Sequence, residues 1–275
     1  MRIRVAHETV YTYDPPASGV IQVLRATPRN HDGQYVLRWR VETSEDCRFD
    51  QAEDAFGNIT HTLTAAGPLS RLSIAVDGEV ETQDQNGIVR GAVERFPPGL
   101  FLRDTPLTTA DANIAEMVAK LRDQKQDGVL SVVHAVLDHL HEEISCDPDP
   151  ARAAAAASEA LALRRGSAQD LAHIFVAACR SIEIPARYVS GYFCDPDAEE
   201  EQVAGHAWAE AFVPDLGWVA FDPANGFCPT EAHIRVAVGL DYLGAAPVRG
   251  SRYGRGAETM RFAVGADSSG RQVQS

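Results

Sequence analysis

The segment Gly166-Ser167-Ala168-Gln169-Asp170-Leu171-Ala172-His173 marks the start of a helix. Apolar residues continue from it at the spacing of one helical face, namely Leu171, Ile174, Phe175, Ala178 and Ile182. Ser167 and Asp170 have the spacing of a capping box, with Asp in the place of Glu. Ser167 is therefore the predicted N-cap, and Ala168 is the predicted first helical residue.

Position 168 is a favourable place for a nucleophilic thiol, but this chain has an alanine there. A cysteine at a helix start lies against the positive end of the helix dipole. That setting lowers a thiol pKa from about 8.5 to about 3.5–7.5, and nearby backbone N–H groups can stabilise an oxyanion. Ser167 is rotated by about 100° from position 168 on the helix. Because its hydroxyl is expected to bond backbone N–H groups, we predict that Ser167 is a cap and not a nucleophile.

Two strand-like runs downstream carry a histidine and an aspartate. They contain Gly205-His206-Ala207-Trp208 and Phe221-Asp222-Pro223, and the turn sequence Pro214-Asp215-Leu216-Gly217 joins them as a hairpin. A four-residue loop would place His206 and Asp222 on opposite faces of the sheet. An odd loop, or one bulge, puts Asp222 opposite Trp208 and on the same face as His206, about 7–8 Å away.

A His–Asp dyad at this hairpin therefore predicts a loop of three or five residues, or a bulge. In such a dyad the carboxylate of Asp222 is expected to accept the Nδ1 proton of His206 and to hold the imidazole tautomer. Spacing alone leaves open that His206 is an ordinary strand histidine bonded to backbone or water.

Composition indicates an acidic globular protein. The chain has 275 residues, 45% of them hydrophobic, which is enough for one large domain or two ordinary ones. The net charge of −14 argues against nucleic acid or an anionic membrane as the main partner. No signal core and no apolar run near about 18 residues is found. Five widely spaced cysteines without a C-x-x-C pair predict reduced thiols in a cytoplasmic protein.

The expected fold class is α+β, with a β-rich domain over residues 1–95. Turn signals such as Asp14-Pro15-Pro16 and Asp77-Gly78 separate its short strands, which suggests a small sandwich or barrel-like domain. The predicted strands are Arg2–Val10, Gln34–Thr43, Asn58–Thr64 and Leu72–Val80. A proline-containing connection is expected over residues 96–107. Residues 251–275 are expected to form a C-terminal strand, near Met260–Val264, and a flexible tail.

Residues 108–250 are expected to form a second domain of helices packed on an antiparallel sheet. Its predicted strands are Ala186–Phe193, His206–Val213 and Trp218–Phe221. Three histidines lie in or beside one of its helical stripes, but their spacing suits no pair of metal ligands on one face: His134, His139 and His141. We therefore predict no metal site.

Three blocks of the sequence resemble bacterial transglutaminase-like proteins, which belong to a superfamily of papain-like Cys-His-Asp enzymes. The blocks are the run from Leu163 to Asn225, the segment HIRVAVGLDYLGAAPVRG at His233–Gly250, and DAFGN at Asp54–Asn58. The resemblance covers most of the chain. It implies a bacterial transglutaminase-type N-terminal domain over residues 1–95 and a papain-like core, with the nucleophile at a helix start facing a sheet that carries His and Asp.

The resemblance also implies the roles of single residues. The cysteine of the family falls on Ala168, its histidine on His206 and its aspartate on Asp222. Gln169 and Asp170 match residues that flank the cysteine, and a catalytic role and a helix-dipole role are both open to them. Further candidates for substrate or oxyanion contacts are Trp208, for which a core position is equally open, and Tyr188, Tyr192 and Asn225.

A parent form with the cysteine would act on peptide amide bonds. If water accepts the acyl group, the parent form is a protease or amidase, and if an amine accepts it, the parent form is a transglutaminase. We favour water, because no separate acceptor site is evident. For this chain, Ala168 leaves two origins open. It is an introduced replacement, which the intact surroundings favour, or the chain is a natural pseudoenzyme that binds peptides or a partner protein. The expected partner is a peptide or protein, and no metal or organic cofactor is required.

Overall fold

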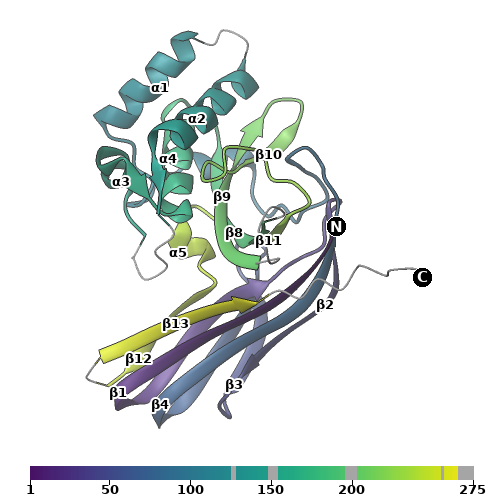
Figure 1. The fold of residues 1–275 in the computed structure, drawn as a ribbon, viewed down its shortest axis with the longest axis vertical. Coiled ribbons are helices and arrows are strands. Elements are labelled where there is room, and N and C mark those ends of the chain that lie inside the picture. The colour runs from purple at the N-terminus through teal and green to yellow at the C-terminus, as the bar shows by residue number, and fades with distance from the viewer. Residues whose placement is uncertain (125–127, 148–153, 196–202, 255–256, 266–275) are drawn as a thin grey trace, which may run out of the picture.

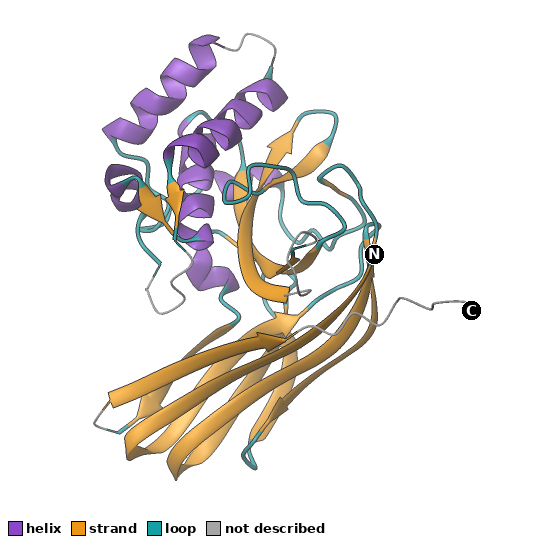
Figure 2. Cartoon of the chain, in the orientation of Figure 1, coloured by secondary structure: helices purple, strands orange, loops and turns teal. Residues whose placement is uncertain are grey.

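A computed structural model describes residues 1–124, 128–147, 154–195, 203–254 and 257–265 of the chain. It has two parts, a sheet of long strands and a shorter sheet covered by helices (Figures 1 and 2). The fold class is the expected mixture of helices and antiparallel sheet. None of the described helices combines the length and the apolar character that crossing a membrane requires.

The N-terminal sheet is built on two long antiparallel strands, β1 (Arg2–Thr27) and β4 (Ile59–Thr82). The strand order is β12-β1-β4-β2, with β13 also paired to β1 and β3 also paired to β4. These neighbours are β2 (Gln34–Thr43), β3 (Arg48–Glu53), β12 (Val248–Tyr253) and β13 (Ala257–Gly265). The pairing of β1 and β4 shifts in register between Thr12 and Ala17.

The long strands run through two layers. One buried cluster joins Tyr11 and Leu72, on one side of the register shift, to Leu24 and Leu63 on the other, so the two halves face each other. The predicted turn at Asp14-Pro15-Pro16 lies inside β1, at this irregularity, where the strand passes from one layer to the other. A proline is tolerated there because a bulge leaves ladder positions unpaired.

The predicted turn at Asp77-Gly78 is wrong, since both residues lie within a regularly paired part of β4. Gly78 pairs with Trp39 of β2, and a Cβ at residue 78 would lie 2.1 Å from the indole ring. The glycine therefore makes room for Trp39 across the sheet.

The second sheet is antiparallel and has the order β11-β8-β9-β10-β5. Its strands are β5 (Ile88–Val89), β8 (Ala186–Cys194), β9 (Val203–Val213), β10 (Gly217–Phe221) and β11 (His233–Gly239). A separate small parallel pair is formed by β6 (Ser145–Cys146) and β7 (Arg165–Gly166).

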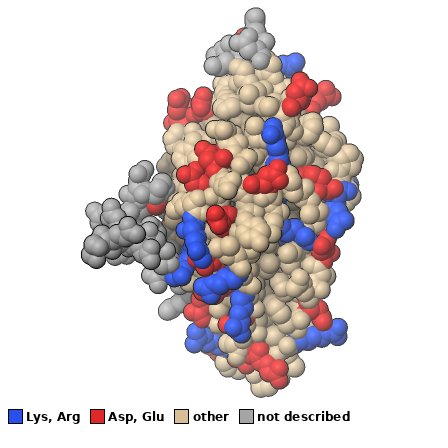
Figure 3. Space-filling model, turned by 90° about the vertical axis from the view of Figure 1, so that its right-hand side faces the viewer, with Lys and Arg blue, Asp and Glu red and all other residues tan. Residues whose placement is uncertain are grey.

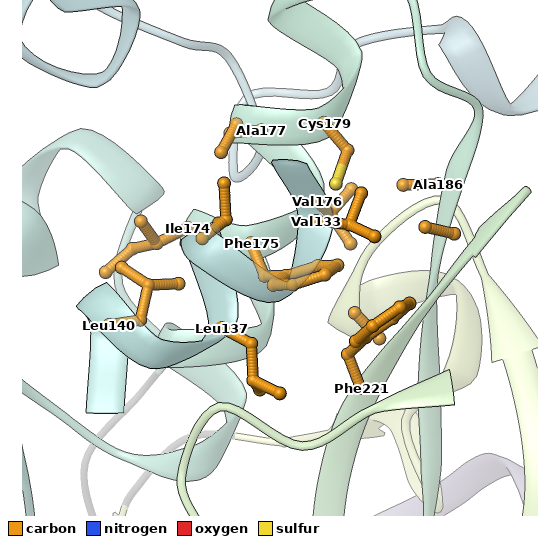
Figure 4. Packing of buried hydrophobic residues seen from close by; sticks show 14 of the residues in the cluster. Val133, Leu137, Leu140, Ile174, Phe175, Val176, Ala177, Cys179, Ala186 and Phe221 are labelled. Carbon is orange, nitrogen blue, oxygen red and sulfur yellow. The ribbon is translucent and has the colours of Figure 1, made fainter. Parts of the chain in front are cut away.

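Helices cover this sheet on one side. They are α1 (Ala112–Gln124), α2 (Val129–Glu143), α3 (Ala157–Leu163), α4 (Ala168–Ser181) and α5 (Tyr242–Ala245). The 3-10 helix η1 (Pro98–Leu102) lies on the other side, where Phe101 packs against Trp218 and Arg187. The apolar face of α4 packs between α2 and the sheet, where Phe175 stacks on Phe221 at 5.1 Å between ring centroids (Figure 4). This packing fixes the start of α4 relative to the β9–β10 hairpin.

The expected domain boundaries do not separate the two sheets, because each sheet contains a strand from the stretch of sequence assigned to the other part. β12 begins at Val248, inside the expected core of residues 108–250, yet it pairs with β1 of the N-terminal sheet. β5 lies inside the expected N-terminal domain of residues 1–95, yet it pairs with β10. The predicted strand at Met260–Val264 lies within β13, which also pairs with β1. The tail after residue 265 is outside the described residues.

Candidate active site

The start of α4 has the geometry that its sequence predicts. Ser167 is the N-cap, and its side chain accepts a hydrogen bond from the backbone N–H of Asp170. The Asp170 carboxylate accepts in return from the backbone N–H and the hydroxyl of Ser167. Ala168 is the first helical residue and is half-buried. The hydroxyl of Ser167 is engaged in the cap, as expected.

The predicted hairpin carries the predicted dyad. Val213 pairs with Gly217, so the loop has three residues, Pro214 to Leu216, and the prediction of an odd loop is confirmed. The same register places Asp222 opposite Trp208. The Nε2 atom of His206 lies 2.6 Å from Oδ2 of Asp222.

The nitrogen expected to face Asp222 was Nδ1, and that prediction is wrong. Nε2 lies farther from the backbone than Nδ1, and the two residues are diagonal neighbours across a strand pair, so the outer nitrogen is the one that reaches. Within the described residues, Nδ1 of His206 makes no hydrogen bond.

Asp222 accepts hydrogen bonds from several groups that the sequence analysis did not identify. Its Oδ2 also accepts hydrogen bonds from Nε2 of His233, at 3.1 Å, and from Nδ2 of Asn225, at 2.8 Å. Its Oδ1 accepts from the backbone N–H groups of Ala224 and Asn225. Burial alone would raise the pKa of Asp222, but the charge of His206 and the hydrogen bonds from both histidines hold it well below its ordinary value.

Trp208 lies in the core, next to His206 of the dyad. Its indole is buried against Val189, Ala220 and Val238, which is the core position that the sequence left open. Its ring centroid is 6.1 Å from that of His206. Gly191 pairs with His206, and a Cβ there would lie 2.6 Å from the indole, so the glycine lets Trp208 pack close.

Other predicted site residues fall into two groups. Gln169, Tyr188 and Tyr192 line one cavity together with His206. Asp170 is buried, and besides its capping bonds it accepts the backbone N–H of Ala155 at 2.6 Å. These contacts give Asp170 a structural role at the start of α4.

The sequence reasoning missed two histidines. His173 is buried in α4, where Nε2 accepts the backbone N–H of Tyr242, and it ties this helix to α5. His233 lies at the start of β11 and bonds Asp222. The available signal for His233 was its place at the head of the block HIRVAVGLDY.

His206, Asp222 and His233 also have the donor types of a metal site, and their ligand atoms lie within 4.8 Å of one another. The Asp222 oxygen in this group already accepts from both imidazoles and from Asn225. A metal there would displace both imidazole protons. Hydrogen bonding accounts for the cluster without a metal.

Cys146 is a thiol near the dyad, but its setting is unfavourable for a thiolate. It lies on β6, beside Gly166 of β7. Burial and the negative charges of Asp222, Asp147 and Asp170 raise the pKa of its thiol. Cys146 therefore lacks the electropositive setting of a reactive thiol.

Comparisons with known proteins follow the two parts of the fold. Residues 115–223 match the family described as "Transglutaminase-like superfamily", and residues 3–81 match the "Bacterial transglutaminase-like N-terminal region". "Uncharacterized protein ML0607" of Mycobacterium leprae is 30% identical over 283 residues, which cover 96% of this chain and 97% of that protein.

One solved structure shares the fold at lower identity, and a second is less similar. A structure from Cytophaga hutchinsonii, named "a Putative Cysteine Protease", has a TM-score of 0.74 at 20% identity and covers 99% of this chain and 92% of that one. The periplasmic domain of TgpA from Pseudomonas aeruginosa has a TM-score of 0.41 at 15% identity and covers 79% of this chain and 87% of that one. At 20% identity, the likeness to the structure from Cytophaga hutchinsonii concerns the fold.

Proposed function

Since this chain belongs to the transglutaminase-like superfamily, we propose that its site binds a peptide amide between position 168 and the His206–Asp222 dyad. With Ala168 the chain binds the amide without cleaving it, and a cysteine at that position converts binding into cleavage. The observation that carries the proposal is the dyad itself, held at 2.6 Å by a three-residue hairpin loop.

The chemistry of the cysteine form follows from the hydrogen bonds of His206. In the neutral ring Nε2 carries the proton that Asp222 accepts, so Nδ1 has the lone pair that takes a proton from the thiol. The thiolate sulfur attacks the amide carbon, and first-turn N–H groups of α4 stabilise the oxyanion. The imidazolium then gives its proton to the leaving amine as the C–N bond breaks, which leaves a thioester on the sulfur.

Water as the acyl acceptor completes an amidase or protease cycle. His206 takes a proton from water, the hydroxide attacks the thioester, and the acid is released with the thiol restored. A primary amine in place of water would give the crosslinked product of a transglutaminase. We favour water, because the sequence offers no separate amine site.

The test is the reactivity of a thiol placed at position 168. Ala168→Cys puts it at the positive end of α4, and Ser181→Cys puts a matched thiol at the negative end of the same helix. Both variants are treated with iodoacetamide at pH 6, and alkylation is mapped by mass spectrometry. We expect the thiol at 168 to react at least about tenfold faster than the thiol at 181, because its pKa is lowered.

Two controls separate the dyad from the helix. His206→Ala in the Ala168→Cys chain is expected to slow alkylation at pH 6 and to abolish turnover of a peptide library. The unmodified chain reports the background of its native thiols, which are Cys47, Cys146, Cys179, Cys194 and Cys228. A thiol at 168 no more reactive than the one at 181 would contradict the proposal.

We also place the protein in the cytoplasm. Its five cysteines are widely spaced in the sequence and form no C-x-x-C pair, which is typical of a reducing compartment. Thiol titration of the freshly isolated, unfolded protein should find five titratable thiols per chain. A disulfide in that sample would argue for an oxidising compartment.

A further inference from the structure

A cavity of about 160 Å³ opens beside His206, and both parts of the molecule form its walls. Gln169, at the start of α4, and Tyr192 of β8 line it from the core. His7 and Thr9, on one face of β1, line it from the N-terminal sheet. Val248, at the start of β12, closes another side.

The polar groups of the wall bond one another. Nδ1 of His7 lies 2.9 Å from the hydroxyl of Tyr192, and Nε2 lies 2.9 Å from Oγ1 of Thr9. Arg25, which also lines the cavity, pairs with Asp54 at 2.8 Å. A ligand in this cavity would gain little by offering a charge to these groups.

Two titratable groups of the wall, His7 and Tyr192, are neutral near pH 7. Burial lowers the pKa of His7 to about 4 and raises that of Tyr192 above its ordinary value. Among the described residues that line the cavity, Arg25 alone is permanently charged, and Asp54 balances it. Because an unpaired charge is costly to bury, the cavity selects an uncharged group.

The volume of the cavity further limits the kind of group that it can bind. A cavity of about 150 Å³ with apolar walls holds benzene, which matches the volume beside His206. We propose that this cavity binds one aromatic or leucine-sized side chain of the substrate, and that the N-terminal sheet supplies one of its walls. The position of that side chain next to the amide at residue 168 rests on the function proposed above.

The unmodified chain is the right protein for the test, since Ala168 prevents turnover during binding. The probes are N-acetyl-X-glycine amides with X as Phe, Leu, Ala or Glu, titrated by NMR. We expect the Phe and Leu probes to bind at least about tenfold more tightly than the Ala probe. The Glu probe should bind no better than the Ala probe.

Two matched variants test whether the preference for the Phe probe arises in this cavity. Val248 and Val41 are both half-buried and pack on the same apolar cluster of the N-terminal sheet, but only Val248 lines the cavity. Val248→Phe should fill the cavity and reduce binding of the Phe probe to that of the Ala probe. Val41→Phe should keep the preference. Circular dichroism checks that both variants fold.

The outcomes separate this inference from the proposed function. Equal binding of the Phe and Ala probes by the unmodified chain would overturn the inference, and so would a folded Val248→Phe chain that keeps the preference. Selective binding, combined with an unreactive thiol in Ala168→Cys, keeps the cavity and rejects the proposed chemistry. A reactive thiol in Ala168→Cys, combined with equal binding of the Phe and Ala probes, supports the proposed chemistry and rejects the inference about the cavity. If Val248→Phe does not fold, the probe series decides alone.

Discussion

At the scale of residues, one carboxylate serves two histidines. Oδ2 of Asp222 accepts from Nε2 of His206 at 2.6 Å and from Nε2 of His233 at 3.1 Å. Asn225 adds a third donor to the same oxygen. An oxygen held from these directions cannot rotate away from His206, so His233 and Asn225 position the dyad.

Replacing His233 should therefore weaken the dyad from a distance. In the Ala168→Cys chain, His233→Phe keeps a ring beside Phe193 and Trp208 but removes the donor to Asp222. A hydrogen bond to a charged group contributes about 1.5–3 kcal/mol, so we expect alkylation at pH 6 to slow by about 10- to 100-fold. Because the pKa of Asp222 should rise, the acid limb of the pH profile should move to higher pH. His233→Gln should restore part of the rate, and an unchanged profile in His233→Phe would exclude a positioning role.

At the scale of elements, the core sheet contains a buried ion cluster that joins three strands. Glu210 of β9 is fully buried and lies 2.6 Å from Nε of Arg187 on β8 and 2.6 Å from Nε of Arg235 on β11. Arg187 also lies 3.9 Å from the ring of Trp218 and bonds Glu94. Burial would raise the pKa of Glu210, but the two arginines lower it to about 2.

Removing the charge of Glu210 should be costly and should alter the response to acid. Glu210→Gln leaves Arg187 without its buried partner, and we expect a loss of about 3–5 kcal/mol at pH 7 in urea unfolding. The folded pKa of about 2 lies below the ordinary value of 4.5, so Glu210 stabilises fully above pH 4.5 and loses this effect as pH falls toward 2. The variant should lack that part of the acid dependence. Glu116→Gln, at an exposed ion pair on α1, is the control and should change little.

At the scale of the whole molecule, the N-terminal sheet completes the core. Gln34 and Asn58 bond the backbone of the edge strand β11, with Asn58 bonding both the N–H and the carbonyl of Val238 at 2.8 Å. Ile3 and Val5 of β1 share an apolar cluster with Tyr192 of β8. On the face in Figure 3, acidic side chains lie among basic ones over both parts of the molecule. The two parts therefore form one folded unit.

Asn58→Ala should weaken that union. It leaves the buried N–H and carbonyl of Val238 without partners, each at a cost of about 1–3 kcal/mol. We expect a loss of about 2–5 kcal/mol in urea unfolding, measured by circular dichroism. Asn113→Ala, at an exposed side chain that bonds Asp111, should change stability by less than about 0.5 kcal/mol. A variant as stable as the unmodified chain would show that this contact does not hold the parts together.

Local features of the site were predictable from the sequence because neighbouring residues decide them. The cap at Ser167 and the start of α4 depend on residues within one helical turn. The loop of three residues follows from the requirement that His206 and Asp222 share a face, since side chains alternate along a strand.

Contacts between distant segments could not be predicted in this way. His233 reaches Asp222 because β11 pairs with β8, and the cavity exists because β1 packs on the core. The turn expected at Pro15 became a bulge because β4 pairs along both sides of it. By itself the sequence determined a capped helix with Ala168 at its start and a hairpin that aligns a histidine with an aspartate. The tertiary structure alone decided which nitrogen faces Asp222, which donors hold that carboxylate and what lines the cavity, because these depend on pairing and packing between segments far apart in the chain.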